Sequence, residues 1–392
     1  MNHVKHFFLF IFLLGVFAMV YLFLYSYLTN NFNARQVVAI KVADQVKEKQ
    51  KEAITVHGPS PAPFISEKNE SVEAQIPEKS DLKNFSWSQV TSSAPWGSRD
   101  SAVSFVFKNK MWTMGGLNGN GDVTYGHKIK YWEAPYFNDI WTSDDGANWS
   151  RVAEHAEWSP RRSMSVVLFK GALWMFGGWG PINGYAKDVW KSTDGVIWKR
   201  VVSNVPWSVR EGQTAEVFQG KIWLIGGVDY DNRETKNDVW YSENGIDWYE
   251  ATASAPWSSR WDHATAVFGG KIFLSGGMNL NKQTFGDVWS SSDGTNWEKV
   301  SPNPSWQVRQ GHTLVIFQDM IWSVGRLNDN GGVNDIWYSK NGLSWQKTAF
   351  DPPWLGREDH SVLVFKDRIY VFGGMDSNWH WQNDVWVSSN LK

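Results

Sequence analysis

The chain has 392 residues, with 38 basic and 40 acidic side chains, 34 glycines, 27 tryptophans and no cysteine. This near balance of charge argues against a dedicated nucleic-acid-binding protein, which normally carries a basic domain. The lack of cysteine excludes disulfides, thiolate metal sites, a cysteine nucleophile and cysteine-derived cofactors. Tryptophan is several times more frequent than usual, so we expect it to recur by a structural rule.

Residues 1–30 have the pattern of a membrane anchor. After Lys5 and His6, the stretch Phe7–Leu28 carries no charge. At 1.5 Å per residue, a helix of that length spans a hydrocarbon core of about 30 Å. A cleaved signal peptide is the alternative, but residues 25–30 lack its small-x-small site. Positive charge lies close to the membrane only on the N-terminal side, so we expect a single-pass anchor with the bulk of the chain on the extracytoplasmic side.

Residues 31–84 have the composition of a linker. Its first part, residues 34–56, is rich in Lys, Gln, Glu, Ala and Val and could form a short polar helix. Prolines and a scatter of Ser, Glu and Lys follow, and this composition is typical of an extended tether. We expect the segment to act as a spacer between the anchor and the rest of the chain.

Residues 85–392 form an internal repeat. Six tryptophans recur at spacings of 48 to 62 residues: Trp87, Trp149, Trp198, Trp248, Trp297 and Trp345. Each unit has a W-x-x-R turn, an apolar run ending in Phe, a second run usually ending in Gly-Gly, an Asp-Val/Ile-Trp strand and a turn. Four short runs per unit predict a small antiparallel sheet. Six such sheets can bury both faces when they stand radially, so we predict an all-β, six-bladed propeller.

The pattern resembles Kelch repeats, most clearly from Arg357 to Ser389, and the resemblance covers roughly three quarters of the chain. The fifth unit departs from it, with Gly325-Arg326 in place of the double glycine. The resemblance implies a propeller used for protein binding, as a scaffold or, less often, as an enzyme. It also implies that ligands bind on the face that carries the W-x-x-R loops. The galactose oxidase type is excluded, because its cofactor needs a cysteine.

The strand count predicts how the ring closes. The last unit has three strands, the third of them at Asp384–Trp386, and residues 84–90 match a fourth strand. We therefore expect the N-terminal strand to complete the last blade and leave no open edge.

Short hairpin turns of the type S-x-D/N-G precede the recurring tryptophans. They are similar to the Asp-box turn of sialidase-like propellers, but are one residue shorter between Asp and Gly. Asp-Gly and Asn-Gly close tight hairpins because both residues accept a positive φ. We interpret five residues as turn formers and not as catalytic groups: Asp145, Asp194, Asn244, Asp293 and Asn341.

Five tryptophans stand outside the repeat positions, in loops that we assign to one face: Trp132, Trp179, Trp261, Trp379 and Trp381. Tyr131 and Tyr185 share two of these loops. A cluster of exposed aromatic side chains on loops marks a sugar or protein partner. The alternative is that these rings fold over the loops as a minor core.

The W-x-x-R arginines are the second candidate set: Arg99, Arg161, Arg210, Arg260, Arg309 and Arg357. Six guanidinium groups near one axial mouth would bind a carboxylate or a sulfate. Their presence in every unit favours the alternative of a structural role, by stacking on the preceding tryptophan or by holding loop carbonyls.

Two hypotheses for the function follow. The first is a membrane-tethered recognition propeller that binds a glycan or a protein through its aromatic and Arg-bearing loop face, with no nucleic-acid partner. The second is a glycan-acting hydrolase or lyase that uses carboxylates such as Glu211, Asp262 and Glu358, with histidines, at the axial mouth. We predict no cofactor and no metal, although His263, His312 and His360 begin three consecutive first strands.

Overall fold

The computed structural model describes residues 85–120, 124–125, 128–129, 132–301, 306–328, 331–349 and 351–390. The predicted anchor at 1–30 and the linker at 31–84 lie outside these residues. In the described part of the chain, no helix is both long and apolar enough to cross a membrane.

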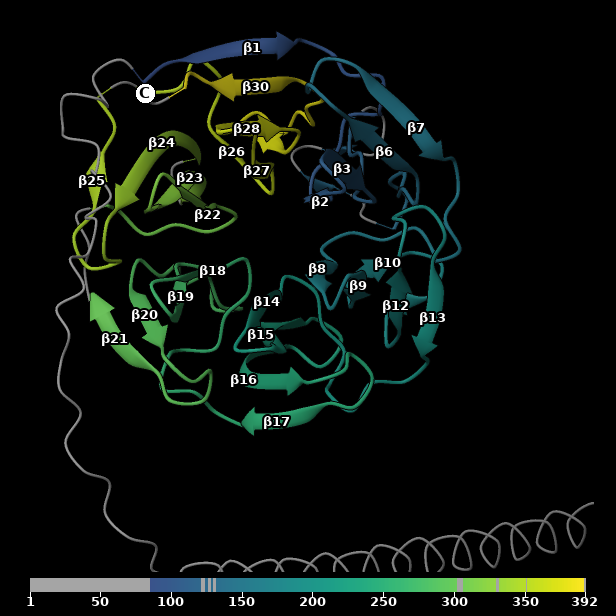
Figure 1. Ribbon diagram of the computed structural model, residues 1–392, viewed down its shortest axis with the longest axis vertical. Helices are drawn as coiled ribbons and strands as arrows, with labels where there is room; N and C mark the ends of the chain where they lie inside the picture. The colour runs from purple at the N-terminus through teal and green to yellow at the C-terminus, as the bar shows by residue number, and fades with distance from the viewer. Residues whose placement is uncertain are drawn as a thin grey trace, which may run out of the picture. The chain divides into compact units, whose positions relative to one another are not determined.

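The described residues form six four-stranded antiparallel sheets around one axis, which confirms the predicted all-β, six-bladed propeller (Figure 1). Blade 1 consists of β2 (Val103–Phe107), β3 (Lys110–Met114), β6 (Ile140–Ser143) and β7 (Trp149–Ala153). Blade 2 consists of β8 (Ser165–Phe169), β9 (Ala172–Phe176), β12 (Val189–Ser192) and β13 (Lys199–Val202). Blade 3 consists of β14 (Thr214–Phe218), β15 (Lys221–Asp229), β16 (Glu234–Ser242) and β17 (Tyr249–Thr252).

The other three blades repeat this order from the axis outward. Blade 4 consists of β18 (Ala264–Phe268), β19 (Lys271–Ser275), β20 (Val288–Ser291) and β21 (Glu298–Ser301). Blade 5 consists of β22 (Thr313–Phe317), β23 (Met320–Asn328), β24 (Gly331–Ser339) and β25 (Gln346–Lys347). Blade 6 consists of β27 (Ser361–Phe365), β28 (Arg368–Phe372), β30 (Val385–Ser388) and β1 (Trp87–Thr91).

Strand β1 is the outermost strand of blade 6, although it comes first among the described strands. It pairs antiparallel with β30, so that Trp87 stands opposite Ser388 and Gln89 opposite Trp386. Figure 1 shows the two strands side by side at the rim of the ring. Blade 6 is therefore built from both ends of the described chain.

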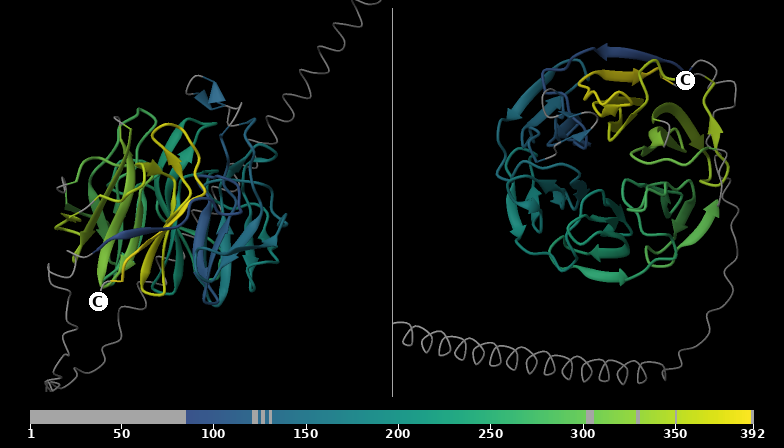
Figure 2. Two further views of the ribbon diagram at one scale, coloured as in Figure 1. Left: turned by 90° about the horizontal axis from the view of Figure 1, so that it is seen from above. Right: turned by 180° about the vertical axis from the view of Figure 1, so that it is seen from behind.

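Three two-stranded ribbons extend the loops of blades 1, 2 and 6. They are β4 (Thr124–Tyr125) with β5 (Lys128–Ile129), β10 (Trp179–Gly180) with β11 (Gly184–Tyr185), and β26 (Arg357–Glu358) with β29 (Met375–Asp376). In the side view, the first of these ribbons projects above the blades (Figure 2). These ribbons enlarge the loops of one face of the ring.

Large apolar side chains fill the space between neighbouring blades. In one such cluster, Phe176 of blade 2 and Ile222 of blade 3 pack with Trp207 and Trp248. The tryptophan of every W-x-x-R turn is at most 5% exposed. The recurrence of tryptophan thus reflects packing between blades, because each interface needs the same large apolar volume.

The predicted turn formers hold the hairpins between the third and fourth strands. The carboxylate of Asp145 accepts the backbone N–H groups of Ala147 and Asn148 at 2.9 and 2.8 Å. The Ser143 hydroxyl accepts the N–H of Gly146 at 2.8 Å. The same bonds to the turn backbone recur at Asp194, Asn244, Asp293 and Asn341, so the predicted role is confirmed.

Candidate functional site

The W-x-x-R arginines are 0 to 2% exposed and bind inside their own blades. Arg210 is representative: Nη1 and Nη2 each donate to the carboxylate of Asp238 at 2.7 Å. Asp238 also accepts the indole N–H of Trp240 at 2.8 Å. The same pairing to the Asp directly before the third strand joins Arg99 to Asp139, Arg161 to Asp188, Arg260 to Asp287 and Arg357 to Asp384. This is the geometry of the structural alternative, because the guanidinium groups face the blade interior and not the mouth.

In blade 5 the repeated Arg–Asp pair has a different geometry. Arg326, which replaces the second glycine, lies 3.2 Å from Asp335, while Arg309 stands 3.6 Å from the same carboxylate. Arg309 Nη1 instead donates to the Ser323 hydroxyl at 2.9 Å. Burial lowers the pKa of Arg309 to about 9, an effect that Asp335 opposes and Arg326 reinforces. Two arginines therefore share one carboxylate in this blade.

The second residue after each repeated arginine forms a collar around the axis. The axial collar comprises Ser101, Ser163, Gly212, Asp262, Gly311 and Asp359, all with φ between 50° and 61°. Its backbones bond from blade to blade: Ser101 N–H donates to Asp359 C=O at 2.9 Å, and Asp359 N–H donates to Gly311 C=O at 3.0 Å. Similar bonds join Ser163 to Ser101, Asp262 to Gly212 and Gly311 to Asp262. The collar thereby fixes the carboxyl groups of Asp262 and Asp359 at the mouth.

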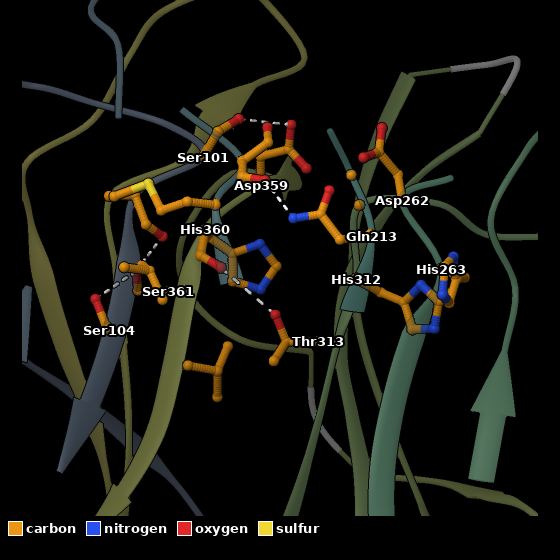
Figure 3. Close-up of a pocket in the computed structure, with 17 residues that line it drawn as sticks. Ser101, Ser104, Gln213, Asp262, His263, His312, Thr313, Asp359, His360 and Ser361 are labelled. Atoms are coloured by element: carbon orange, nitrogen blue, oxygen red, sulfur yellow. Dashed lines mark hydrogen bonds between the residues drawn. The ribbon is translucent and has the colours of Figure 1, made fainter. Parts of the chain in front are cut away.

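Two cavities meet at the collar, where they share Ser163, Asp262 and Asp359. The axial cavity, of about 230 Å³, runs along the innermost strands. Figure 3 shows Asp262 and Asp359 at one end of it, beyond the imidazoles of the three histidines. The mouth pocket, of about 630 Å³, opens on the other side of the collar, among the loops.

The three histidines, His263, His312 and His360, pack against the preceding blade. The Cε1 atom of His312 would lie 2.6 Å from a Cβ added to Gly276, so only glycine fits opposite this ring. His312 Nε2 bonds with the Ser275 hydroxyl at 2.9 Å. Burial, with nearby arginines, lowers the pKa of His263 and of His360 to about 3, so both rings are neutral at physiological pH. In the described residues, no group of His, Asp and Glu has the arrangement of a metal site.

Aromatic side chains from four consecutive blades line the mouth pocket: Trp132, Trp179, Tyr185, Tyr230 and Trp261. Trp132 is 66% exposed, whereas Trp261 is 7% exposed. Trp261 meets the Tyr230 ring edge-on with centroids 5.8 Å apart, and Trp179 meets Tyr136 at 5.5 Å. The Tyr185 hydroxyl accepts the backbone N–H of Tyr230 at 2.9 Å, which ties the loops of blades 2 and 3 together.

The other predicted aromatic residues lie elsewhere. Trp381 is 2% exposed and packs with Leu117, Ala134 and Met375, with Trp379 against the same cluster. The Asn120 side chain bonds both the N–H and the C=O of Trp381, at 3.0 and 2.9 Å. These two rings thus belong to a minor core at the junction of blades 6 and 1, which was the alternative to an exposed binding surface. Tyr131 falls outside the described residues.

Carboxyl groups form the floor of the mouth pocket. Arg162 binds Glu211 through two bonds, from Nε at 2.9 Å and from Nη2 at 3.0 Å. Burial raises the pKa of Asp262 and of Glu358 well above the usual range, and the charge of Asp359 adds to the effect at both. Burial also raises the pKa of Asp359, against the opposing effects of Arg162 and of the Ser101 hydroxyl.

Sequence reasoning missed Tyr230, Arg162 and Gln310 as pocket residues. The signal was available in the alignment of the repeats, because the position directly after the repeated arginine lines the mouth pocket in five of the six units. Five residue types occupy it in the six units: Asp100, Arg162, Glu211, Trp261, Gln310 and Glu358. The repeated arginine is the same in all six units, but the residue after it varies in charge and size. Such variation next to a constant position indicates a ligand site and not a packing role.

Comparison with known proteins adds to this geometry. A Kelch motif matches residues 356–387, which span the ribbon β26–β29 and most of blade 6. The search of curated proteins found no match to the chain. The motif match and the six-bladed ring are together consistent with a propeller of the Kelch-repeat type.

Proposed function

We propose that this propeller is a recognition module that binds a glycan in the mouth pocket. Kelch propellers are typical of recognition and protein-binding roles, but the fold alone does not choose the ligand. The observation that carries the proposal is the composition of the pocket. About 630 Å³ of space combines five aromatic side chains with carboxyl groups and one amide. Such a mixture of apolar walls and few convergent polar groups is characteristic of ligand sites.

A sugar ring can interact with both the aromatic and the polar side chains of this lining. Its C–H face packs against an aromatic face, and its hydroxyl groups bond to carboxylates and amides at the ring edge. Trp132 offers an open indole at the entrance, and Trp179 and Trp261 stand deeper with their rings braced by tyrosines. Bracing favours affinity, because rings already held in place lose little freedom on binding.

Oligosaccharide binding by the full chain, measured by glycan array and then by calorimetry, tests this proposal. We expect Trp179→Ala to weaken binding of any glycan hit by tenfold or more, because one stacking face is lost. Tyr249→Ala is the matched control, since Tyr249 is 54% exposed on the outer strand β17 and outside the pocket. If the two variants bind equally, or if no glycan binds, the ligand is not a glycan in this pocket, and a protein partner becomes the leading candidate.

A hydrolase or lyase acting on a glycan is the second candidate, and the raised pKa values of the floor favour it. A carboxyl group that stays protonated at neutral pH can donate a proton to a leaving group. Burial and the charge of Asp359 raise the pKa of Glu358 and of Asp262 in this direction, next to the Arg162–Glu211 pair. An enzyme predicts product formation from a bound oligosaccharide, and Glu358→Gln would abolish the product while the oligosaccharide still binds. A pure recognition module yields no product from the wild-type chain.

Membrane tethering on the extracytoplasmic side belongs to the same proposal and rests on the uncharged stretch Phe7–Leu28. Cell fractionation of the full chain and of a chain without residues 1–30 tests it. The full chain should sediment with membranes and be cleaved by external protease, whereas the shortened chain should not sediment. A full chain found in the soluble fraction would contradict the proposal.

A further inference from the structure

We infer that the glycan bound in the mouth pocket carries ammonium groups, as in chains of de-N-acetylated amino sugars. This inference rests on the proposed function and narrows its ligand class. The composition of the pocket, its unsatisfied acceptor and its aromatic faces each favour a cationic donor.

The first observation is the imbalance of charged groups. Five carboxyl groups line the pocket: Glu211, Asp231, Asp262, Glu358 and Asp359. Arg162 is the one basic side chain among the described lining residues, and two of its donors bind Glu211. Four carboxyl groups thus face the space without a basic partner of their own in the lining. An anionic ligand would be repelled there, whereas an ammonium group would supply the missing charge.

The second observation is an acceptor without a donor. Gln310 lines the pocket, and its Oε1 is buried with no hydrogen-bond partner in the described structure. The Gln310 side chain also interacts with Glu358, where it opposes the rise in the pKa of that group. Since a buried unpaired acceptor is costly, a ligand N–H placed here would gain more than a bond in water provides.

The third observation is the aromatic wall. The negative faces of indole and phenol rings attract an ammonium group as well as the C–H face of a sugar. Trp132, Trp179 and Trp261 come from the loops of blades 1, 2 and 4 and line the pocket together with the carboxyl groups. A neutral sugar would offer the carboxylates its hydroxyl groups alone, while an amino sugar would add a charged donor. The pocket therefore discriminates between two sugars that differ only in their nitrogen substituent.

The inference also predicts that protons are released when the ligand binds. In the empty pocket, burial raises the pKa of Asp262, Glu358 and Asp359, so they hold protons above their usual range. The titratable groups around them are Arg162 and Tyr185 of blade 2, Glu211 and Asp231 of blade 3, and Asp100 of blade 1. A bound cation stabilises the ionised carboxylates, so binding should expel protons. A neutral sugar has no comparable effect on the carboxyl groups.

Calorimetry with matched oligosaccharides tests the inference. The full chain is titrated with a glucosamine pentasaccharide and with its fully N-acetylated counterpart, at about pH 6, where the ammonium form is well populated. We expect the glucosamine oligomer to bind at least tenfold more tightly. We also expect net proton release, measured as a difference in heat between two buffers of unlike ionisation enthalpy. Added salt should weaken only the binding of the cationic oligomer.

Asparagine variants test how much the carboxyl groups of the pocket floor contribute to binding. Asp262 and Asp359 have φ of 50° and 52°, which asparagine tolerates, so the double change Asp262→Asn and Asp359→Asn keeps the collar backbone. This variant should lose most of the preference for the glucosamine oligomer, together with the proton release, and should bind the N-acetylated oligomer as before. Asp319→Asn is the control: Asp319 has φ 51° and is exposed in the turn between β22 and β23, outside the pocket.

The outcomes separate the inference from the proposed function. Equal binding of the two oligomers, or a preference for the N-acetylated one, overturns the inference but leaves glycan recognition standing. Binding of neither oligomer, nor of any glycan, overturns both. A penta-lysine peptide that binds more tightly than the glucosamine oligomer would show that the pocket selects a basic protein segment, and it would overturn the glycan assignment.

Discussion

Arg210 and Glu211 are neighbours in the chain and both are buried, yet they belong to two different electrostatic regions. Arg210 is neutralised inside its own blade by Asp238, in an arrangement that recurs around the ring. Glu211 faces the axis, where the corresponding positions of other blades carry Asp100, Gln310 and Glu358. The repeated position builds the fold, and the varied position beside it builds the site.

The two regions also differ in how they respond to pH. Paired carboxylates such as Asp238 have a lowered pKa because Arg210 binds their charged form against the effect of burial. Asp100, Asp262 and Glu358 have raised pKa values because they are buried and lie near other carboxyl groups. The carboxylates paired with arginine therefore stabilise the fold at pH values above their usual pKa. The carboxyl groups with raised pKa values destabilise the fold as the pH rises.

The largest effect is expected where the repeated pair is broken. Asp238→Asn leaves the Arg210 guanidinium buried without a counter-charge, so the free energy of unfolding should fall by about 3–5 kcal/mol. Urea denaturation at neutral pH measures this change. Glu358→Gln is the matched change at the mouth, and it should cost little because its carboxyl group has a raised pKa. Equal losses in the two variants would refute the distinction between the regions.

A smaller effect, of opposite sign, is expected at Asp100. Burial and the nearby Asp359 raise its pKa from 3.8 to about 8, so the folded state retains a proton that the unfolded chain releases between these values. Stability contributed by the neutral form is therefore present at low pH and is lost as the pH rises toward 8. Asp100→Asn removes this loss and should stabilise the protein more at pH 8 than at pH 5, by about 1–3 kcal/mol. Thermal unfolding at both pH values measures it, and an equal shift at both would contradict the assignment.

Blade 5 offers an intermediate test, because its carboxylate has two arginines. Arg326→Gln removes one of them, but Arg309 lies only 3.6 Å from Asp335 and can take its place. The cost should therefore be about 1–2 kcal/mol, below that of Arg210→Gln in blade 3, where Asp238 has one arginine partner. Urea denaturation of the two variants gives the comparison. A larger cost in blade 5 would show that Arg326 is the essential partner.

The sequence predicted the blades well, because hydrophobic alternation and turn residues are local signals that six units repeat. It did not predict the pairing of Arg210 with Asp238, since the two stand 28 residues apart and meet only when the blade folds. Nor could it separate Trp179 from Trp381, because both lie in loops of similar composition. Trp381 is covered by the loop around Asn120, a contact between residues 261 positions apart, whereas Trp179 borders an open cavity.

The smallest effect is expected on the opposite side of the blades, in the hairpin turns. Asp145→Ala removes two bonds to backbone N–H groups, one to the Asn148 side chain and one to the Ser143 hydroxyl, but leaves the Ser143–Gly146 bond in place. The turn is exposed, so water replaces the lost acceptor and the cost should be about 1 kcal/mol. Asp145→Asn should cost less, because Asn244 and Asn341 already fill the same position in blades 3 and 5. Neither change should alter ligand binding, because the turn contributes no residue to the mouth pocket. If either variant weakened binding while its unfolding midpoint stayed near that of the wild type, the turn face would have to be counted as part of the site.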